Sequence, residues 1–273
     1  MSDRYAVIGN PVAHSQSPLI HAEFARQTGQ DMVYERLLAP LDGFKETVQK
    51  FFSAGGKGLN VTVPFKHDAW ALADVHRGDA PDAQAVNTLK SENGKLAGYN
   101  TDGIGLVTDI KQNLGFQIAG KRVLLLGAGG ASHGVMFPLL REQAQTLVVA
   151  NRTLEKAQTL VRSVDKRTGA VATSLDAVPY ADLANSQFDI VINATSAGLS
   201  GEMPPLPGGV FAPGALAYDM VYGRDTPFMI FARNAGARAV DGLGMLVEQA
   251  AESFLIWRGV RPRTAAVIQK LRG

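Results

Sequence analysis

The amino-acid sequence predicts a two-domain α/β protein, with an N-terminal domain built on a mixed sheet and a Rossmann-type, doubly wound dinucleotide-binding domain. Three observations lead to this fold class. The chain has 273 residues, of which 46% are hydrophobic, enough for about two ordinary domains and too many for a disordered chain. Short β-branched runs alternate with longer amphipathic stretches. A glycine-rich turn at residues 127–131 follows an apolar strand and precedes a helix.

The N-terminal part contains the elements of the mixed sheet, in which strands and helices alternate. Strands are predicted near residues 5–8, 32–38 and 57–63, and helices at about residues 18–28 and 41–54. The pair Asn93-Gly94 separates two apolar runs at 86–89 and 96–99, a pattern typical of a β-hairpin. This hairpin adds an antiparallel corner to an otherwise parallel sheet.

A second series of strands and helices begins after a predicted helix at about residues 104–113. Its strands are predicted at residues 122–126, 146–150, 170–173, 189–193, 216–219 and 238–240. A series of this size is typical of a dinucleotide-binding domain. Two helices at 243–258 and 262–271 follow without a further strand, and we expect them to return to the first domain. The predicted domains are therefore residues 1–101 with 242–273, and residues 102–241.

Charge and composition exclude several classes of protein. The 27 Lys and Arg residues nearly balance the 25 Asp and Glu residues, without long runs of one sign, so neither nucleic acid nor a membrane is expected as a partner. Cysteine is absent and the five histidines form no H-x-x-x-H pair, so no metal site is expected. The N-terminal segment resembles neither a secretory signal nor a transmembrane span. We therefore expect a cytoplasmic protein.

The glycine-rich turn predicts a nucleotide site. Gly127 permits a tight turn after the strand, and Gly129 lets backbone N–H groups approach a pyrophosphate. Ser132, in the third position of the pattern, is small enough for close packing of helix and strand. The strand before the turn and the helix after it favour nucleotide binding over a purely structural turn.

The end of the next strand indicates which nucleotide binds. An acidic residue there would accept a hydrogen bond from the ribose 2′-hydroxyl of NAD, but the strand ends in Asn151, Arg152 and Thr153, with Lys156 in the following helix. Cations and a hydroxyl suit the 2′-phosphate of NADP. The alternative is an ordinary helix start with exposed basic residues.

Polar residues also gather where a strand of the first domain ends. Asn60 and Thr62 alternate onto one face at the carboxyl end of their strand, the edge at which open α/β sheets bind ligands. Lys66 lies beyond the break made by Pro64. By itself this lysine also fits a solvated residue at a helix start.

Two further pairs complete the candidate site of the first domain. Ser15 and Ser17 lie just before a helix, and Asn87 and Asp102 flank the hairpin. Ser17 followed by Pro18 also fits an ordinary capped helix start, and Asp102 fits a helix N-cap, so these alternatives stay open. Together the neutral donors and acceptors, one cation and one anion suit a small polyhydroxylated ligand.

Motifs in one fixed order cover nearly the whole chain. They are HSQSP at 14–18, NVTVPFK at 60–66, AVNT at 85–88, NTDG at 100–103, GAGGA at 127–131, NRT at 151–153, NATSAG at 193–198, DMVY at 219–222 and DGLGMLVEQA at 241–250. In this set the chain resembles the NADP-dependent shikimate dehydrogenases. The resemblance implies two α/β domains and reversible hydride transfer between NADP and C3 of shikimate, which gives 3-dehydroshikimate on the route to chorismate and aromatic amino acids.

The resemblance also implies roles for residues of the substrate site. Ser15 and Ser17 match the pair that grips the substrate carboxylate, with Tyr222 nearby. The residues that match groups around the ring hydroxyls are Asn60, Thr62, Asn87, Thr101, Asp102 and Gln249. Lys66 matches the catalytic lysine, paired with Asp102, and our hypothesis is that the two handle the proton as a unit.

On the cofactor side, the resemblance implies contacts from the two motifs that surround the glycine turn and the next strand. These residues are Gly127, Ala128, Gly129, Gly130, Ala131, Asn151, Arg152, Thr153 and Lys156. Met220 and Gly242 match positions near the nicotinamide. Lys156 replaces an arginine common in the family, which should weaken planar stacking more than charge.

Two other functions remain open from the sequence. A quinate/shikimate dehydrogenase with broader use of substrate or of NAD would share most of these motifs. A non-catalytic NADP(H)-sensing protein on the same scaffold should have lost Lys66 or Asp102, and both are present. Monomer and homodimer are both compatible with the sequence.

Overall fold

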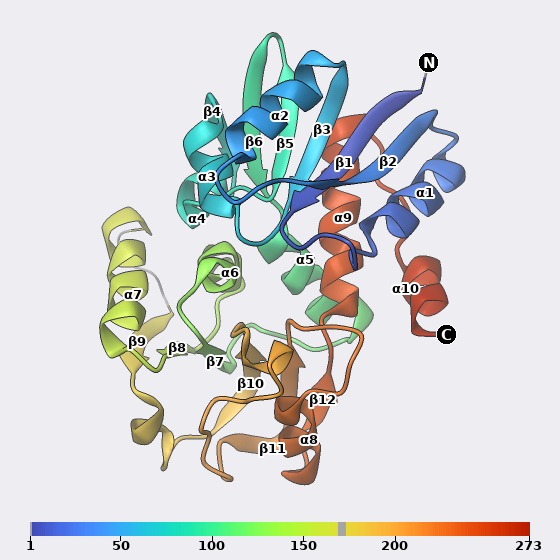
Figure 1. The fold of residues 1–273 in the computed structure, drawn as a ribbon. Coiled ribbons are helices and arrows are strands. Elements are labelled where there is room, and N and C mark those ends of the chain that lie inside the picture. The colour runs from blue at the N-terminus through green and yellow to red at the C-terminus, as the bar shows by residue number, and fades with distance from the viewer. Residues whose placement is uncertain (1, 169–172) are drawn as a thin grey trace. The chain divides into compact units, whose positions relative to one another are not determined.

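The computed structural model describes residues 2–168 and 173–273, which form two compact units. One unit comprises Met1–Gly105 and Leu246–Gly273, and the other comprises Leu106–Met245. Each contains one six-stranded sheet (Figure 1). One sheet is mixed and the other parallel, which confirms the predicted fold class. Within the described residues, no helix combines the length and the apolar character that a membrane span needs.

The sheet of the first unit is mixed because one strand is reversed. Its strands are β1 (Asp3–Gly9), β2 (Met32–Leu38), β3 (Gly56–Val61), β4 (Val75–Gly78), β5 (Thr88–Glu92) and β6 (Lys95–Asn100). They lie in the order β2-β1-β3-β5-β6-β4, with β5 antiparallel to β3 and β6. Asn93 and Gly94 have positive φ, as the predicted hairpin turn requires. The ends of β3 and β6 therefore meet the start of β5 at one edge.

Helices cover both faces of this sheet. They are α1 (Ser17–Thr28), α2 (Phe44–Ser53), α3 (Lys66–Leu72), α4 (Ala80–Ala83), α9 (Leu243–Arg258) and α10 (Ala265–Arg272). Ile8 of β1 packs in a cluster with residues of α2, whereas Phe24 of α1 packs with Phe254 of α9. A Cβ at Gly58 would collide with Nε1 of Trp257, so glycine there lets α9 approach the sheet. The C-terminal helices thus pack on the first unit, as predicted.

The sheet of the second unit is parallel throughout. Its strands are β7 (Arg122–Leu126), β8 (Thr146–Ala150), β9 (Ser174–Val178), β10 (Phe188–Asn193), β11 (Phe211–Asp219) and β12 (Arg238–Val240). The order β9-β8-β7-β10-β11-β12 is that of a Rossmann fold. Val123 and Leu125 enter one core, and Leu124 and Leu126 enter another. Both faces are therefore buried, as expected for a parallel sheet.

The helices of the second unit connect these parallel strands. They are α6 (Gly130–Arg141), α7 (Leu154–Thr168) and α8 (Pro227–Asn234), with 3₁₀ turns η2 (Tyr180–Leu183) and η3 (Ala197–Leu199). The helix predicted at residues 104–113 is α5 (Asp102–Thr108) followed by a π-helix, η1 (Asp109–Asn113). The chain passes from one unit to the other twice, within α5 after Gly105 and within α9 after Met245.

Several predicted boundaries differ from the observed ones because turns replace the ends of elements. The helix predicted from residue 41 begins at Phe44, since Gly43 N–H bonds the Pro40 carbonyl in a turn. The strand predicted to residue 63 ends at Val61, since Phe65 N–H bonds the Thr62 carbonyl. The helix predicted from residue 262 begins at Ala265. Strand β4 was not predicted, because four residues at a sheet edge carry too short a pattern.

One predicted strand cannot be compared directly. The strand predicted at residues 170–173 falls mostly on residues 170–172, which lie outside the described residues. The third strand of the parallel sheet is β9, which begins at Ser174.

Candidate functional site

An ion pair lies at the edge of the first sheet where β3 and β6 end. Lys66 is the first residue of α3, placed there by the turn after β3, and Asp102 is the first residue of α5, two residues after the end of β6. Lys66 Nζ lies 2.5 Å from Asp102 Oδ2, and the two side chains are 20% and 10% exposed. The amide N–H of Asp102 bonds Asn100 Oδ1, so the side chain of Asn100 accepts from the first N–H of the helix. The carboxylate of Asp102 accepts from Lys66 through Oδ2.

Asn87 holds the other oxygen of this carboxylate. Its Nδ2 donates to Asp102 Oδ1 over 2.8 Å and to Thr101 Oγ1 over 2.9 Å. Its Oδ1 accepts from the Thr101 backbone N–H at 2.9 Å. Because Asn87 and Thr101 are both buried, these bonds are shielded from water and fix the side chains relative to the ion pair.

Helix α9 joins the same polar cluster. Gln249 Oε1 lies 3.4 Å from Thr101 Oγ1, and Ser253 Oγ accepts from Asn60 Nδ2 at 2.9 Å. Asn60 Nδ2 also donates to Thr88 Oγ1 at 3.1 Å. The structure therefore brings together the predicted residues Asn60, Lys66, Asn87, Thr101, Asp102 and Gln249.

The cluster contains residues that the sequence prediction missed. Thr88 follows Asn87 in the AVNT motif, and Ser253 lies one helical turn after Gln249, so both positions could have been found by extending the motif along its element. Tyr34, whose hydroxyl lies 2.7 Å from Asn60 Oδ1, lies on β2 and carries no such signal. Burial raises the pKa of Tyr34 well above 10, while a hydrogen bond with Ser17 acts in the opposite direction.

The two serines of the HSQSP motif lie where the chain enters α1. Ser17 is buried and begins the helix, and its backbone N–H bonds Ser15 Oγ at 3.3 Å. Gln16 occupies the N-cap position, so Ser17 is not a capping residue. Arg36 Nη2 donates to the Ser15 carbonyl at 2.6 Å and anchors the turn. Thr62 directly follows β3, and among the described residues no hydrogen bond joins its hydroxyl to the cluster.

A buried histidine lies next to this region. The ring of His21 stacks on Tyr34 with a centroid distance of 4.2 Å, and Phe254 and Trp257 lie nearby. Both ring nitrogens are buried without a hydrogen-bond partner among the described residues. Burial lowers the pKa of His21 to about 3, so the ring is neutral at ordinary pH.

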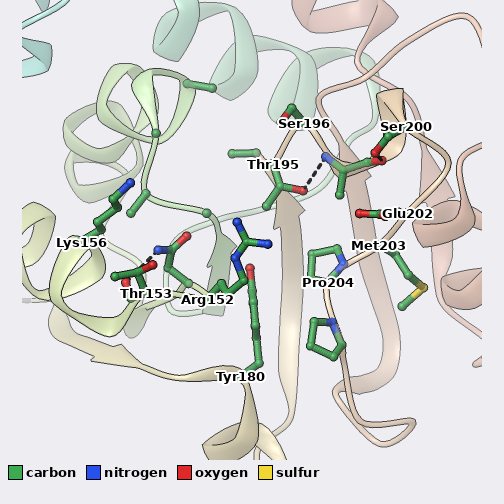
Figure 2. Close-up of a pocket in the computed structure, with 18 of the residues that line it drawn as sticks. Arg152, Thr153, Lys156, Tyr180, Thr195, Ser196, Ser200, Glu202, Met203 and Pro204 are labelled. Carbon is green, nitrogen blue, oxygen red and sulfur yellow. Dashed lines mark hydrogen bonds between the residues drawn. The ribbon is translucent and has the colours of Figure 1, made fainter.

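The second unit carries a cavity of about 610 Å³ at the carboxyl ends of its central strands (Figure 2). Predicted cofactor residues line it: Gly127, Ala128, Gly129, Gly130, Ala131, Asn151, Arg152, Thr153 and Lys156. Residues that the sequence prediction did not assign complete the wall: Tyr180, Ala194, Thr195, Ser196, Ala197, Ser200, Glu202, Met203, Pro204 and Pro205. The NATSAG motif at the end of β10 was a signal for residues 194–197, since it too lies at the end of a central strand.

The glycine turn is shaped for a phosphate group. Gly127 has φ of 101°, a conformation that favours glycine, and Ser132 Oγ donates to its carbonyl at 2.8 Å. A Cβ at Gly129 would meet nothing within 4 Å, so the backbone there borders open space. The following helix α6 directs its N-terminus at the cavity, where its first N–H groups and its dipole favour an anion.

Two side chains of the cavity wall, Arg152 and Lys156, carry positive charge. Arg152, Thr153 and Lys156 are exposed and follow β8, and no acidic residue stands at that strand end. Figure 2 shows Arg152 beside Tyr180, and its charge partly opposes the burial that raises the pKa of Tyr180. This donor set fits a dinucleotide with an extra phosphate better than one with a free ribose 2′-hydroxyl.

The remaining predicted residues lie elsewhere in the second unit. Met220 and Gly242 are adjacent, since a Cβ at Gly242 would collide with the Met220 carbonyl oxygen, but neither lines the cavity. Tyr222 is half-buried in the loop after β11. The roles predicted for these three residues stay predictions. Among the described residues, no group of three His, Cys, Asp or Glu side chains could hold a metal ion.

Comparison with known proteins identifies related sequences over the whole chain. Family models match residues 7–89 (shikimate dehydrogenase substrate binding domain), 109–200 (shikimate / quinate 5-dehydrogenase) and 242–272 (shikimate 5′-dehydrogenase C-terminal domain). A shikimate dehydrogenase (NADP(+)) from Methylobacillus flagellatus is 59% identical over 99% of each chain. One from Aromatoleum aromaticum is 58% identical over 99% of this chain and 97% of the other.

Solved structures agree in fold along the whole chain. An Ael1 enzyme from Pseudomonas putida has a TM-score of 0.92 and 48% identity, covering 99% of this chain and 98% of the other. A shikimate 5-dehydrogenase from Thermus thermophilus, solved in complex with NADP(H) and shikimate, has a TM-score of 0.86 and 32% identity with the same coverage.

Proposed function

Because the chain belongs to the shikimate dehydrogenase family, we propose that it catalyses the reversible, NADP-dependent reduction of 3-dehydroshikimate to shikimate. The observation that carries the proposal is the buried polar cluster around the Lys66–Asp102 ion pair, with its 2.5 Å contact. The reaction belongs to the route to chorismate and the aromatic amino acids. Relatives with 56–59% identity are named for this activity with NADP.

The chemistry requires a group that exchanges a proton with the C3 hydroxyl. NADP, when bound, accepts the hydride from C3, and NADPH returns it in the reverse direction. In the proposed mechanism Lys66 exchanges the hydroxyl proton, and Asp102 holds the lysine in place and accepts from a second ring hydroxyl. Asn87 supports this arrangement because its N–H already donates to Asp102.

Substrate binding in this proposal relies on neutral hydrogen-bonding groups. Ser15 and Ser17 hold the carboxylate from the start of α1, and Tyr222 assists. Thr62, Thr101 and Gln249 bind ring hydroxyls. A hydroxyl that is bound by buried polar groups gives strong discrimination, because an analogue without it leaves those groups unpaired.

The cavity of the second unit would hold NADP. Residues 127–131 and the N-terminus of α6 would bind the pyrophosphate through backbone N–H groups. Arg152, Thr153 and Lys156 would bind the 2′-phosphate, and Met220 and Gly242 would lie near the nicotinamide. Glu202 on the cavity wall would face the ligand from the other side (Figure 2).

Steady-state kinetics test the proposal. The values of kcat/KM are measured for shikimate and for quinate, each with NADP and with NAD, by following nicotinamide absorbance. We expect shikimate with NADP to exceed every other combination by at least about tenfold, since unmatched polar groups cost this much or more. Equal use of quinate or NAD would instead assign a quinate/shikimate dehydrogenase, and NADP binding without turnover would assign a sensor.

Two further properties, the oligomeric state and the cellular location, are part of the proposal. The substrate is a small molecule, and the chain acts as a monomer or a homodimer, which sedimentation at several protein concentrations would distinguish. We also propose that the enzyme works in the cytoplasm, where the reduced cofactor is available to it.

A further inference from the structure

The orientation of the Asn87 amide is set by a group that can only donate. The backbone N–H of Thr101 lies 2.9 Å from one terminal atom of this side chain, so that atom must be the oxygen. The nitrogen then faces Asp102 Oδ1 at 2.8 Å. A reversed amide would place two oxygens against each other at Asp102, so only this orientation supports the carboxylate.

The orientation of Asn60 follows in the same way from a group that can only accept. The carbonyl oxygen of Asn87 lies 3.3 Å from one terminal atom of Asn60, which must therefore be the nitrogen. Oδ1 of Asn60 then accepts, and the Tyr34 hydroxyl at 2.7 Å must be its donor. The two N–H groups of Asn60 are taken up by Ser253, Thr88 and the Asn87 carbonyl.

The hydroxyls of Thr88 and Ser253 connect these two amides. Thr88 Oγ1 lies 2.9 Å from Asn87 Oδ1, which can only accept, so Thr88 donates its single proton there. Towards Asn60, Thr88 must then accept. Ser253 Oγ accepts from Asn60 at 2.9 Å, lies 2.8 Å from Thr88 and donates to the Gln249 carbonyl oxygen at 3.0 Å, which ties this end of the cluster to α9. Donation therefore runs in one direction, from Tyr34 through Asn60, Thr88 and Asn87 to Asp102.

The chain of hydrogen bonds is almost free of solvent. Thr88 and Ser253 have no exposed surface, Asn87 is 3% exposed and Asn60 is 6% exposed. Water cannot readily replace a lost partner there, and bonds in such a chain reinforce one another. The loss of one hydrogen bond therefore disturbs the orientation of the next side chain in the chain of hydrogen bonds. The last link is the carboxylate that holds Lys66.

We propose that Tyr34, Thr88 and Ser253 are positioning residues for the reaction, which act through the directed hydrogen-bond chain that ends on Asp102. They do not touch the substrate. Their effect is to hold Asn87 with its N–H towards Asp102 and so keep the carboxylate and Lys66 aligned. In this arrangement both N–H groups of Asn60 are used within the protein, so towards the substrate this side chain could act only as an acceptor through Oδ1. The inference rests on the proposed function.

The central test replaces the Thr88 hydroxyl by a methyl group of the same shape. In Thr88→Val, Asn87 keeps the Thr101 N–H and Asn60 keeps Ser253, so the protein should fold. We expect kcat for shikimate oxidation to fall about 10- to 100-fold, the range for a small misplacement of reacting groups. The value is expressed per NADP-binding site, titrated by fluorescence, so that unfolded protein does not count. The Kd for NADP should change less than about twofold, because the cavity is in the other unit.

The matched variant Thr88→Ser separates the hydroxyl from packing. It removes a methyl group and keeps the donor, so kcat per site should return to within about threefold of the wild-type value. The inference is overturned if Thr88→Val keeps kcat within about twofold of wild type, or if Thr88→Ser loses as much as Thr88→Val. A wild-type protein that binds NADP but does not turn over shikimate would instead contradict the proposed function.

A second pair of variants tests the far end of the chain. Tyr34→Phe removes the donor to Asn60 and keeps the ring that stacks on His21, and we expect kcat to fall about 3- to 10-fold with an unchanged Kd for NADP. Tyr5→Phe is the control, because Tyr5 also packs beside Trp257 but bonds Arg258 outside the chain of hydrogen bonds. Equal kcat values in the two variants would overturn the role of Tyr34.

Discussion

The polar sites of the two units are built in different ways. In the first unit, buried side chains bond one another, and Lys66 and Asp102 are only 20% and 10% exposed. In the second unit, the cavity is bordered by backbone atoms and by the exposed side chains of Arg152, Thr153 and Lys156. The contrast shows two ways of meeting the cost of polar groups in a binding site. One satisfies them within the protein, and the other leaves them in water until a ligand arrives.

This difference fits the task proposed for each site. Proton exchange is sensitive to displacements of a few tenths of an ångström, and a packed and fully hydrogen-bonded cluster holds its groups to that precision. A dinucleotide phosphate brings its own charges, so an open cavity with a helix N-terminus and two cations can bind it without a buried network. Variants in the first unit should therefore alter kcat, and variants in the second should alter cofactor affinity.

The largest effect is expected at Lys66. Lys66→Ala removes the group that exchanges the proton and should lower kcat about 10²- to 10⁴-fold, the range for a positioned acid or base. The Kd for NADP, measured by fluorescence titration, should stay within about twofold of wild type. Near-normal kcat with only a raised KM would show that the lysine binds the substrate and does not handle the proton.

The next effect is expected at the cationic end of the cavity. Arg152→Gln should raise KM for NADP about 10- to 100-fold, as for a lost charge-assisted hydrogen bond, and leave KM for NAD nearly unchanged. Arg162→Gln is the matched control, since Arg162 is an exposed arginine of α7 that does not line the cavity. An equal loss with both cofactors would place Arg152 against adenine and not against the 2′-phosphate.

The buried histidine should make the first unit sensitive to acid. The pKa of His21 is about 3 in the folded protein and 6.5 as a free group, so the unfolded chain binds the extra proton. The contribution of the neutral His21 ring to the free energy of unfolding is complete above pH 6.5. It is lost as the pH falls towards 3, by about 1.4 kcal/mol per pH unit. Between pH 6.5 and 4.5, most carboxylates keep their charge, so they add little to this loss of stability.

Urea unfolding followed by tryptophan fluorescence measures this loss. Trp70 and Trp257 are the two tryptophans of the chain and both belong to the first unit, so the signal reports that unit. His21→Leu should flatten the dependence between pH 6.5 and 4.5. If the slope were the same in wild type and variant, the acid sensitivity would come from another group.

The smallest effect is expected at the surface of the second unit. Arg122 donates to Asp189 through Nε and Nη2 at 3.1 Å each, and this pairing lowers the pKa of Asp189. The side chains are 39% and 25% exposed, so Asp189→Asn should lower the free energy of unfolding by no more than about 1 kcal/mol. Thermal unfolding in low and high salt provides the measurement, and salt should shrink the difference. A loss above about 3 kcal/mol would show that the pair behaves as a buried one.

Elements with a long or regular pattern were predicted well. Strands β2 and β8 and helix α9 have the predicted limits, because each is an apolar-rich run that ends close to a residue typical of turns, namely Pro40, Asn151 and Gly259. The predicted end of β3 and the predicted start of α2 were wrong by a few residues, because backbone hydrogen bonds in turns set these limits. Strand β4 was missed, because its pairing with β6 comes from the sheet and not from its own four residues.

The same division holds for the candidate sites. The glycine turn and the cationic strand end follow from local motifs, because each depends on neighbours along the chain. The pairing of Lys66 with Asp102, which are 36 residues apart, was implied only by the family resemblance. Tyr34 reaches Asn60 from a position 26 residues away, and no local pattern marks it. Ser253 reaches Asn60 from 193 residues away, and its only signal is its place one helical turn after Gln249. The orientations of the Asn60 and Asn87 amides, and so the N–H that faces the Asp102 carboxylate, are decided only when β2, β3, β5 and α9 pack together. The direction of a hydrogen bond depends on the group that lies opposite in space.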